Sequence, residues 1–527
     1  MSTIIDQFLR RATKTPMKTA LIVGYQKRSY ARLTQTSLRL SLCFSARGPG
    51  LRSAIAADDC AEFIEIILAC LWSGHTAVIA DPDWPASALS ANFEGVSVDL
   101  LITEDKAAHP LQKVLPKDIP VLSHSTLNNW LDQSPQSDFT PATDDTPFLI
   151  GFTSGSTGRP KAFCRDQHSW ATSFDASDHE LSTQQEDILL CPGLMKHTLG
   201  LYAVLYAVLR GATAIGSRHF GPDGPEYHAD DILDIIEDQQ VTQLALIPPM
   251  AHWLARAAQR NNRSFSDVRQ VTTTAMKLAD TTASLLKTHL PKARIIEYYG
   301  AAEMGFITIA KPDVPVPAAS VGRAMQGVAL SIRDPENNAA LKPGEIGLVC
   351  VRSPYISSGY LFEYDAGGFR VLPDGSVTVG DFGWLDDSGN LTLSGRENNL
   401  MISGGHKVYP AEIEAIIRDC KEVETACVFG LPNPVWGDIV CLATAPCSTD
   451  TQGLSSLCFD ALPPERCPQD HFALDAIPRT STGKIALAAL RDTLGEQHGA
   501  ALAEMTMGTL KTARQAQRFL RPTDFAG

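Results

Sequence analysis

Short apolar runs alternate with helical patterns through the first 310 residues of this chain, and this alternation constrains the fold more than any other feature. The runs Leu21–Val23, Ser53–Ala57 and Leu100–Thr103 have the length and residue types of buried strands. Ala61–Trp72, which lies between two of them, has the length and apolar content of a helix. Strands that alternate with helices form mostly parallel sheets, so this region is predicted to be an α/β subdomain.

A polar connection at 123–147 separates this region from a second one with the same rhythm. Phe148–Phe152, Leu244–Ile247 and Arg294–Tyr298 are predicted to be buried strands of a second α/β subdomain. After Pro312 the chain changes to short strands separated by turn signals, a texture typical of an antiparallel section. We therefore expect two layered α/β subdomains followed by a small antiparallel β-barrel.

A separate small α+β domain is predicted after Arg396. Its first clear element begins at Pro410, where proline at a helix start and an acid in the first turn precede Ile413, Ile416 and Ile417 on one face. We predict two domains, an N-terminal one at 1–396 and a mobile C-terminal one at 397–527.

Charge and composition exclude several classes of protein. The chain has 45 Lys and Arg against 59 Asp and Glu, a formal charge of −14, which disfavours nucleic acids and anionic membranes as partners. The apolar stretches are far shorter than the about 20 residues of a membrane span, and Met1–Arg11 suits an amphipathic helix better than a secretory signal. The 12 cysteines include no CxxC pair. We expect a cytoplasmic protein with no membrane span and no nucleic-acid partner.

A stretch rich in hydroxyl groups and glycine follows the strand predicted at Phe148–Phe152. Its hydroxyl residues, glycines and closing lysine are Thr153, Ser154, Gly155, Ser156, Thr157, Gly158 and Lys161. Glycines let backbone N–H groups approach an anion, hydroxyls donate further hydrogen bonds, and lysine adds charge. It is not a Walker A loop, because Pro160 precedes the lysine. The stretch predicts a phosphate cradle, although turns that bind no ligand can have this composition.

Four more motifs follow this loop in order. They are Tyr299-Gly-Ala-Ala-Glu303, Gly380-Asp381, Gly395-Arg396 and Pro478-Arg-Thr-Ser-Thr-Gly-Lys484. Together with the loop they resemble the signatures of the adenylate-forming superfamily, which comprises acyl-CoA synthetases, carrier-protein adenylation domains and luciferases. The resemblance covers Ile4–Arg491. It implies ATP and Mg²⁺, and a thiol acceptor that is either coenzyme A or the phosphopantetheine of a carrier protein.

The resemblance implies a nucleotide site. The residues assigned to it besides the loop are Thr274, Ala275, Tyr299, Gly300, Ala301, Ala302, Asp381 and Arg396. Tyr299 is expected to stack on adenine, with the backbone near Thr274 and Ala275 on the other face. Asp381 is expected to accept hydrogen bonds from the ribose hydroxyls, a task that suits two carboxylate oxygens. Arg396 is expected to contact ribose and phosphate.

Three residues are implied to act in catalysis. Glu303 is similar to the family's Mg²⁺-associated carboxylate, and a hard dication prefers oxygen ligands. Lys484 is similar to the lysine of the small domain that bridges the substrate carboxylate and the α-phosphate. His197 is similar to the histidine that lies beside the substrate carboxylate in acyl-CoA synthetases, although a single histidine in a buried turn is more often structural.

The resemblance also implies that the small domain rotates between two half-reactions. The hinge falls at Asn398. Gly404 and Gly405 would then approach the nucleotide and leave room for a narrow pantetheine tunnel, because they lack Cβ atoms. A plain glycine turn before a strand is the alternative for this pair.

Ala302 is a departure from the family, which commonly has threonine there. The missing hydroxyl removes one contact to the α-phosphate, and a hydrogen bond to a charged group is worth about 1.5–3 kcal/mol. Ala162 stands where the phosphate motif usually ends in glycine. We expect a slower enzyme rather than an inactive one.

The acid pocket is expected to be lined by Leu199–Leu209, Ile247–His252 and Gly300–Phe306, whose apolar character fits a small or medium aliphatic or aromatic acid. Phe174-Asp175 has the wording of an α-ammonium site but lies too early in the chain. We predict an ATP-dependent acyl-CoA ligase that forms acyl-AMP and releases AMP. The alternatives are a free-standing adenylation enzyme that loads an acyl or peptidyl carrier protein, and an impaired nucleotide-binding protein that keeps the fold.

Overall fold

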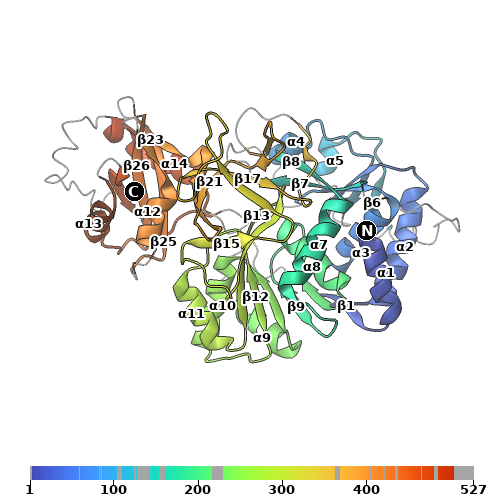
Figure 1. The fold of residues 1–527 in the computed structure, drawn as a ribbon. Coiled ribbons are helices and arrows are strands. Elements are labelled where there is room, and N and C mark those ends of the chain that lie inside the picture. The colour runs from blue at the N-terminus through green and yellow to red at the C-terminus, as the bar shows by residue number, and fades with distance from the viewer. Residues whose placement is uncertain are drawn as a thin grey trace. The chain divides into compact units, whose positions relative to one another are not determined.

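The chain forms two compact units, residues 1–392 and 393–527, called here the N-terminal and C-terminal units (Figure 1). The division falls within β22, Asn390–Arg396. The computed structural model describes residues 3–57, 60–81, 84, 86–103, 110–123, 126, 143, 145–153, 161–216, 229–362, 368–403, 406–418, 420, 422–433, 437–463, 466–479 and 485–503.

One sheet of the N-terminal unit has seven strands in the order β18-β8-β7-β4-β3-β5-β6. Their bounds are β3 Arg52–Ala56, β4 Thr76–Ile79, β5 Leu100–Thr103, β6 Val121–Ser123, β7 Pro147–Thr153, β8 Lys161–Asp166 and β18 Gly359–Tyr360. Five of them run parallel, as the strand–helix alternation predicts, and β8 and β18 add antiparallel pairs at one edge. Tyr360 thereby reaches this sheet from far along the chain, opposite Phe163.

The second sheet has fifteen strands and combines a parallel and an antiparallel part. The strands of the parallel part are β1 Thr19–Val23, β9 Ile188–Cys191, β10 Thr213–Gly216, β11 Gln243–Leu246, β12 Gln270–Thr273 and β13 Arg294–Ala301, and β2 Gln26–Ser29 pairs antiparallel with β1 at the edge. The others are β14 Gly305–Ala310, β15 Ser320–Ala324, β16 Ala329–Arg333, β17 Gly347–Arg352, β19 Arg370–Val371, β20 Val377–Thr378, β21 Asp381–Leu385 and β22.

This sheet differs from the sequence-based expectation in two respects. The order of elements predicts that the run Leu21–Val23 belongs to the first α/β subdomain, but β1 pairs in parallel with β10 of the second sheet. The antiparallel strands expected after Pro312 do form, and they continue the parallel sheet through the β13–β14 and β14–β15 pairs. Both differences concern pairing between strands far apart in sequence, which local patterns do not record.

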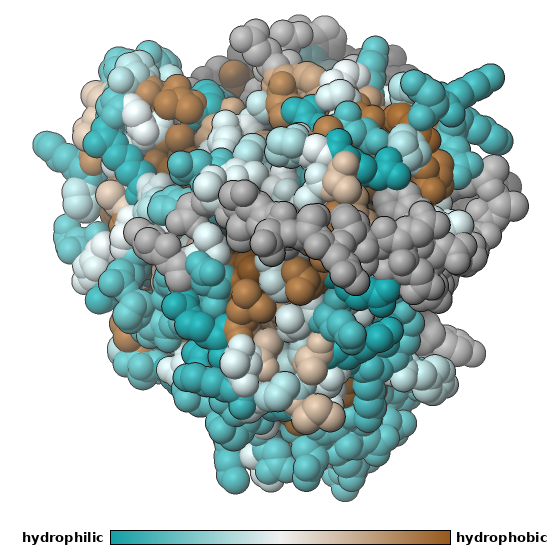
Figure 2. Space-filling view, turned by 90° about the vertical axis from the view of Figure 1, so that its right-hand side faces the viewer, coloured by the Kyte–Doolittle hydropathy of each residue, from teal (hydrophilic) through white to brown (hydrophobic). Residues whose placement is uncertain are grey.

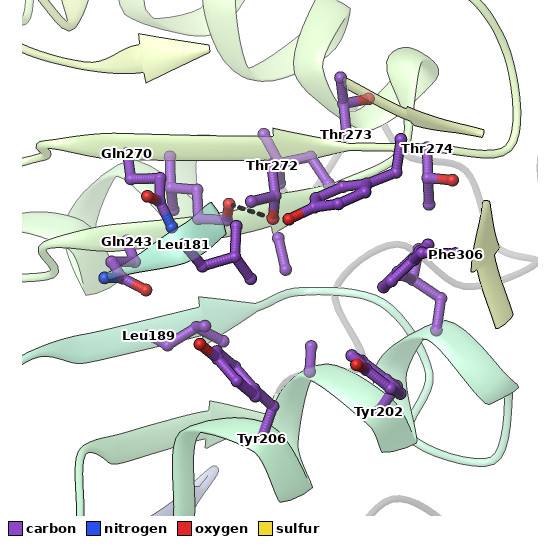
Figure 3. A pocket seen from close by; sticks show the side chains of 16 residues that line it. Leu181, Leu189, Tyr202, Tyr206, Gln243, Gln270, Thr272, Thr273, Thr274 and Phe306 are labelled. Carbon is purple, nitrogen blue, oxygen red and sulfur yellow. Dashed lines mark hydrogen bonds between the residues drawn. The ribbon is translucent and has the colours of Figure 1, made fainter. Parts of the chain in front are cut away.

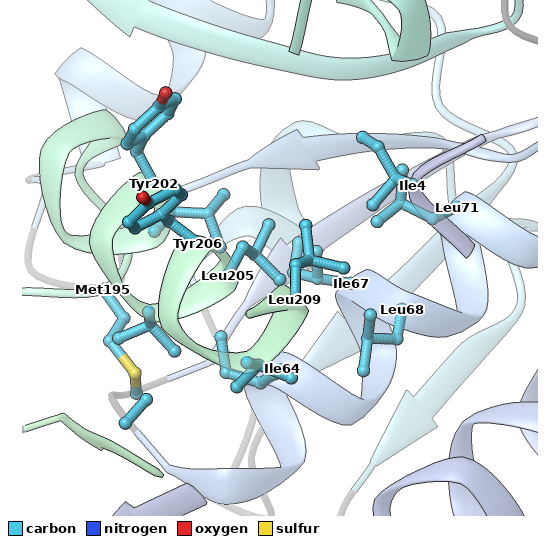
Figure 4. Packing of buried hydrophobic residues seen from close by; sticks show 14 of the residues in the cluster. Ile4, Ile64, Ile67, Leu68, Leu71, Met195, Tyr202, Leu205, Tyr206 and Leu209 are labelled. Atoms are coloured by element: carbon cyan, nitrogen blue, oxygen red, sulfur yellow. The ribbon is translucent and has the colours of Figure 1, made fainter. Parts of the chain in front are cut away.

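Helices bury the apolar faces of these sheets. The helices of the N-terminal unit are α1 Ile4–Lys14, α2 Tyr30–Ser45, α3 Ala61–Ser73, α4 Ala86–Phe93, α5 Leu111–Val114, α7 Gln167–Leu181, α8 Thr198–Leu209, α9 Ala229–Asp238, α10 Pro248–Arg260 and α11 Asp280–His289. In the largest core cluster α3 and α8 contribute side chains such as Ile64, Ile67, Leu205 and Leu209 (Figure 4). Both helices are buried nearly all round, as the apolar runs at 66–72 and 199–209 predict, and the two acids of α3, Glu62 and Glu65, are paired with Arg28.

The C-terminal unit is a sheet with an apolar core on each face. Its elements are β23 Met401–Ser403, β24 His406–Val408, β25 Thr425–Asn433, β26 Gly437–Ala445, β27 Asp470–Ala473, α12 Pro410–Ile417, α13 Thr451–Ala461 and α14 Leu487–Ala503. Along β25, Phe429 and Leu431 join the core that includes Leu490 of α14, whereas Val428 joins the core that includes Ile413 of α12. Alternating side chains of one strand thus serve both faces.

Within the described residues, no helix combines the length and apolar character that crossing a membrane requires. On the face of the molecule that Figure 2 shows, hydrophilic residues dominate and hydrophobic ones are scattered in small patches.

Candidate functional site

Two of the residues predicted to bind adenosine, Tyr299 and Asp381, come together in the N-terminal unit. Tyr299 lies on β13 and Asp381 is the first residue of β21. The Tyr299 hydroxyl donates a hydrogen bond of 2.6 Å to Asp381 Oδ2. Both side chains are buried. The aromatic ring predicted to stack on adenine is thus directly joined to the carboxylate predicted to accept the ribose hydroxyls.

Glu303 forms a cluster with two residues of the seven-stranded sheet. Tyr360 on β18 donates a hydrogen bond of 2.8 Å from its hydroxyl to Glu303 Oε1. Lys161, the last residue of the predicted phosphate loop, has its Nζ 5.6 Å from the centre of the Tyr360 ring. Only 6% of Glu303 and 5% of Lys161 is exposed. We call Lys161, Glu303 and Tyr360 the acid–base cluster.

The charges of this cluster influence each other. Burial lowers the pKa of the Lys161 ammonium, and the negative charge of Glu303 opposes that change. No ion pair with Glu303 occurs within the described part of the chain, and the Tyr360 hydroxyl is its side-chain hydrogen-bond donor there. A buried carboxylate with a single neutral donor keeps lone pairs free for a hard cation, so Glu303 fits the role of a Mg²⁺ ligand.

The turn after β12 carries Thr274 and Ala275 and is held in place by Glu297 of β13. Glu297 Oε1 accepts a hydrogen bond of 2.7 Å from Lys277 Nζ, and its Oε2 accepts one of 3.0 Å from the backbone N–H of Leu278. Ala275 is exposed, with a φ of 77° in the left-handed region that favours glycine. Sequence reasoning missed Glu297, because a single acid in a strand gives no signal of a partner twenty residues away.

The hairpin between β13 and β14 positions the segment from Gly300 to Glu303. A Cβ atom on Gly300 would lie 2.2 Å from the Gly305 carbonyl oxygen, so only glycine fits there. Arg165, buried on β8, donates a hydrogen bond of 2.9 Å from Nη1 to the Ala302 carbonyl oxygen. Burial lowers the Arg165 pKa to about 10, which leaves the guanidinium charged at neutral pH. Sequence reasoning missed Arg165, although a charged residue inside an apolar strand was a visible signal.

His197 lies at the N-terminus of α8, where it is the residue before the first helical turn. Its neighbour Lys196 places Nζ 2.5 Å from Oδ1 of Asp81, which follows β4. The two side chains are 2% and 10% exposed. This buried ion pair, absent from the sequence-based prediction, fixes the loop that carries His197.

The loop residues Ser154, Gly155, Ser156, Thr157 and Gly158, together with Gly404, Gly405 and Lys484, lie outside the described residues. The backbone of Thr153 ends β7. Arg396 is exposed at the end of β22. The roles of all these residues stay predictions.

An apolar pocket lies between α8 and the face of the fifteen-stranded sheet (Figure 3). Its lining residues are Leu181, Leu189, Leu199, Tyr202, Ala203, Tyr206, Gln243, Leu244, Ala245, Leu246, Gln270, Thr272, Thr273, Thr274, Tyr298 and Phe306. The empty volume is about 460 Å³, including space open to solvent. Of the segments predicted to line the acid pocket, α8 and Phe306 also line this pocket, and Gln243–Leu246 of β11 lie beside them; Ile247–His252, where the next helix begins, do not line it. Phe174 is a core residue of α7 that does not line it.

Comparison with known proteins identifies relatives over most of the chain. A profile of the AMP-binding enzyme family matches residues 8–361, and one of the AMP-binding enzyme C-terminal domain matches residues 412–484. An uncharacterized acyl-CoA ligase of Bacillus subtilis (strain 168), YhfT, is 29% identical over 448 residues, which are 84% of this chain and 88% of that protein. Indoleacetate–CoA ligase of Aromatoleum aromaticum is 27% identical over 504 residues, covering 90% and 95% of the two chains.

A solved structure shares the fold. ATP-bound MatB from Rhodopseudomonas palustris superposes with a TM-score of 0.82 at 22% identity, over 94% of this chain and all of that one.

Proposed function

This chain belongs to the AMP-binding enzyme family, and within it to the adenylate-forming enzymes close to acyl-CoA ligases. We propose that it activates a small or medium carboxylic acid whose tail carries no charge. The chain is an AMP-forming acid–CoA ligase. A carboxylate is a poor acceptor for a thiol, so the acid needs a better leaving group before thioester formation.

In the proposed first step, a carboxylate oxygen of the acid attacks the α-phosphorus of ATP, the bond to the β-phosphate oxygen breaks, and pyrophosphate leaves. Tyr299 and Asp381 would hold the adenosine, and Glu303, oriented by Tyr360, would hold Mg²⁺. When bound, Mg²⁺ offsets the negative charge of the phosphates. Lys161 and Lys484 add positive charge where negative charge develops.

In the proposed second step, the CoA thiolate attacks the acyl carbon of the acyl-adenylate, the bond to the phosphate oxygen breaks, and AMP leaves. The acid chain stays in the pocket between α8 and the sheet. Gly404 and Gly405 are proposed to leave room for the pantetheine arm at this stage.

The observation that carries this proposal is the acid–base cluster, in which Glu303 is buried without an ion pair among the described residues and held by Tyr360 beside Lys161. AMP release measured over a panel of carboxylic acids, with ATP, Mg²⁺ and CoA, tests it. We expect AMP and thioester in equal amounts with at least one acid whose tail carries no charge. ATP–pyrophosphate exchange dependent on acid would show the first step by itself.

Two outcomes would change the proposal. Thioester that forms on a carrier protein and not on free CoA would assign the acceptor to the carrier. Failure of every acid to support pyrophosphate exchange would favour an impaired nucleotide-binding protein, the hypothesis that the substitution at Ala302 suggests.

A further inference from the structure

Two glutamines on neighbouring strands form one end of the acid pocket. Gln243 and Gln270 are directly paired in the parallel register of β11 and β12. Figure 3 shows them together at one end, with Thr274 and Phe306 at the other. Thr274 is four residues beyond Gln270, which is about 13 Å along an extended strand. Since Thr274 adjoins the predicted nucleotide turn, the glutamines mark the end of the pocket that is remote from the reacting carboxylate.

Four of the polar side chains that line this pocket, those of Tyr202, Tyr206, Gln243 and Thr272, are hydrogen-bonded to described residues. The hydroxyl of Tyr206 donates a hydrogen bond of 2.9 Å to Asp178 Oδ1, and that of Thr272 donates one of 3.2 Å to the Leu244 carbonyl oxygen. The Gln243 amide nitrogen donates to Asp187 Oδ2 at 3.2 Å, while its oxygen accepts from Thr183 at 2.9 Å.

Gln270 is different from these groups. Its side-chain amide makes no hydrogen bond to any described residue, although only 2% of the residue is exposed. The hydroxyls of Tyr298 and Thr273, two further lining residues, are also buried without a partner in the described part of the chain. Buried amides and hydroxyls are normally hydrogen-bonded, so an unpaired amide facing a pocket indicates a ligand or water that pairs with it.

The pocket lining contains no Asp, Glu, Lys, Arg or His among the described residues. A charged group on the acid would therefore lose its hydration without gaining a counter-ion. An oxygen atom that carries no formal charge needs only a hydrogen-bond donor, and the Gln270 amide offers two N–H groups.

We propose that this pocket selects an acid whose tail carries no charge but bears an oxygen, as hydroxyl, ether or carbonyl, remote from the carboxylate. The Gln270 amide binds that oxygen. This inference rests on the proposed function and specifies its substrate class. An acid with a purely hydrocarbon tail displaces water from Gln270 and leaves the amide unpaired. An acid with the matching oxygen restores the hydrogen bond, and sites of this kind discriminate strongly against the analogue that lacks it.

The experiment compares matched pairs of acids: octanoate with its ω-hydroxy derivative, and 4-phenylbutanoate with its para-hydroxy derivative. For the wild-type enzyme we expect kcat/KM for AMP release to be about 5- to 150-fold higher with the hydroxylated member of at least one pair. Gln270→Leu should bring that ratio close to one, by lowering kcat/KM for the hydroxylated acid and raising it for the hydrocarbon acid.

Thr272→Val is the matched control. Thr272 lines the same pocket on the same strand, but its hydroxyl is already engaged by the Leu244 carbonyl, so the variant should keep the wild-type ratio. A ratio near one in the wild-type enzyme, or a ratio that survives Gln270→Leu, overturns the inference while leaving the proposed function intact.

If none of the four acids supports AMP release, their binding is measured by the shift that each causes in the thermal unfolding midpoint. A larger shift with the hydroxylated acids that Gln270→Leu removes supports the inference without turnover. Equal shifts in both proteins overturn it. Absence of turnover with the whole acid panel would contradict the proposed function separately.

Discussion

Glu303 shows how one residue can be structurally costly and functionally necessary. Among the described residues its buried carboxylate has one hydroxyl donor, Tyr360, and Lys161 is the nearby cation. A buried carboxylate without full pairing lowers stability, which is a common property of functional sites. Removing the one donor should therefore affect activity more than folding.

Tyr360→Phe is expected to lower kcat/KM for MgATP by about 10- to 150-fold, because a hydrogen bond to a charged group is worth about 1.5–3 kcal/mol. Steady-state AMP release at varied MgATP measures this. Tyr25→Phe serves as control, since Tyr25 is fully exposed and its hydroxyl should not matter. An unchanged kcat/KM with a normal unfolding midpoint would show that Tyr360 does not orient Glu303.

Ala302→Thr is expected to raise kcat for adenylation by about 10-fold or more, since it restores a hydroxyl donor beside the α-phosphate. The backbone is already in place, because Arg165 holds the Ala302 carbonyl. Acid-dependent pyrophosphate exchange measures the effect. Ala302→Val adds nearly the same volume without a hydroxyl and should not raise the rate. Equal rates in the two variants would show that another donor supplies this contact.

Some residues of the site could be predicted from the sequence and others could not. Asp381, Tyr299 and Glu303 lie within local motifs, so the sequence was enough to propose them. Tyr360 and Arg165 meet Glu303 and Ala302 across 57 and 137 residues, and no local pattern records such a contact. Gln270 was equally hidden, because an unpaired amide is visible only once its surroundings are known.

At the scale of elements, the buried ion pair between Lys196 and Asp81 joins the loop before α8 to the end of β4. A buried ion pair is weak evidence for stability, but removing one partner leaves the other charge in a poorly hydrated site. This contact determines where α8, and with it one wall of the apolar pocket, begins.

Lys196→Met is expected to lower the free energy of unfolding by about 3–5 kcal/mol, because the Asp81 carboxylate stays buried without its ammonium partner. Urea unfolding followed by tryptophan fluorescence measures the loss. The double variant Lys196→Met/Asp81→Leu removes both charges and should recover part of it. If the double variant loses the sum of the two single losses, the ion pair does not couple these elements.

His471 couples pH to the stability of the C-terminal unit. It lies on β27, and its Nε2 is 2.9 Å from Thr444 Oγ1 on β26. Burial lowers the His471 pKa from 6.5 to about 4. Between these two values the unfolded chain binds a proton that the folded unit does not, so stability falls as pH falls and is constant above the unfolded pKa.

We expect the free energy of unfolding of this unit to fall by up to about 1.4 kcal/mol per pH unit below pH 6.5 through His471. Thermal unfolding of the full chain at several pH values measures it. His471→Gln retains a hydrogen-bonding side chain without titration and should flatten the dependence. A wild-type slope that is unchanged in His471→Gln would assign it to other groups.

The elements themselves were largely predictable, whereas their partners were not. Apolar runs and helical periodicity predict strands such as β7 and helices such as α3, because local burial determines both patterns. The pairing of β1 with β10 and of β18 with β8 joins segments that other elements separate. Such pairing follows from the topology of the whole sheet, which hydrophobic periodicity does not contain.

At the scale of the whole molecule, the division into two units separates the residues of one proposed reaction. Glu303, Tyr299 and Asp381 belong to the N-terminal unit, whereas Lys484 belongs to the C-terminal unit. We propose that this division lets one site serve two half-reactions, with the chain turning at Asn398 between them. On this basis Lys484 is needed for the first half-reaction only.

Lys484→Ala is therefore expected to lower adenylation by at least about 100-fold, since it removes a charge that acts on the developing phosphate charge. Thiolysis of a supplied acyl-adenylate by CoA should stay within a few-fold of the wild-type rate. Pyrophosphate exchange measures the first half-reaction, and AMP release from purified acyl-adenylate measures the second. Lys484→Arg keeps the charge with a different shape and should retain part of the exchange activity. If both half-reactions fall equally in Lys484→Ala, the lysine contributes to the stability of the site or to both steps, and the separation of roles between the two units is wrong.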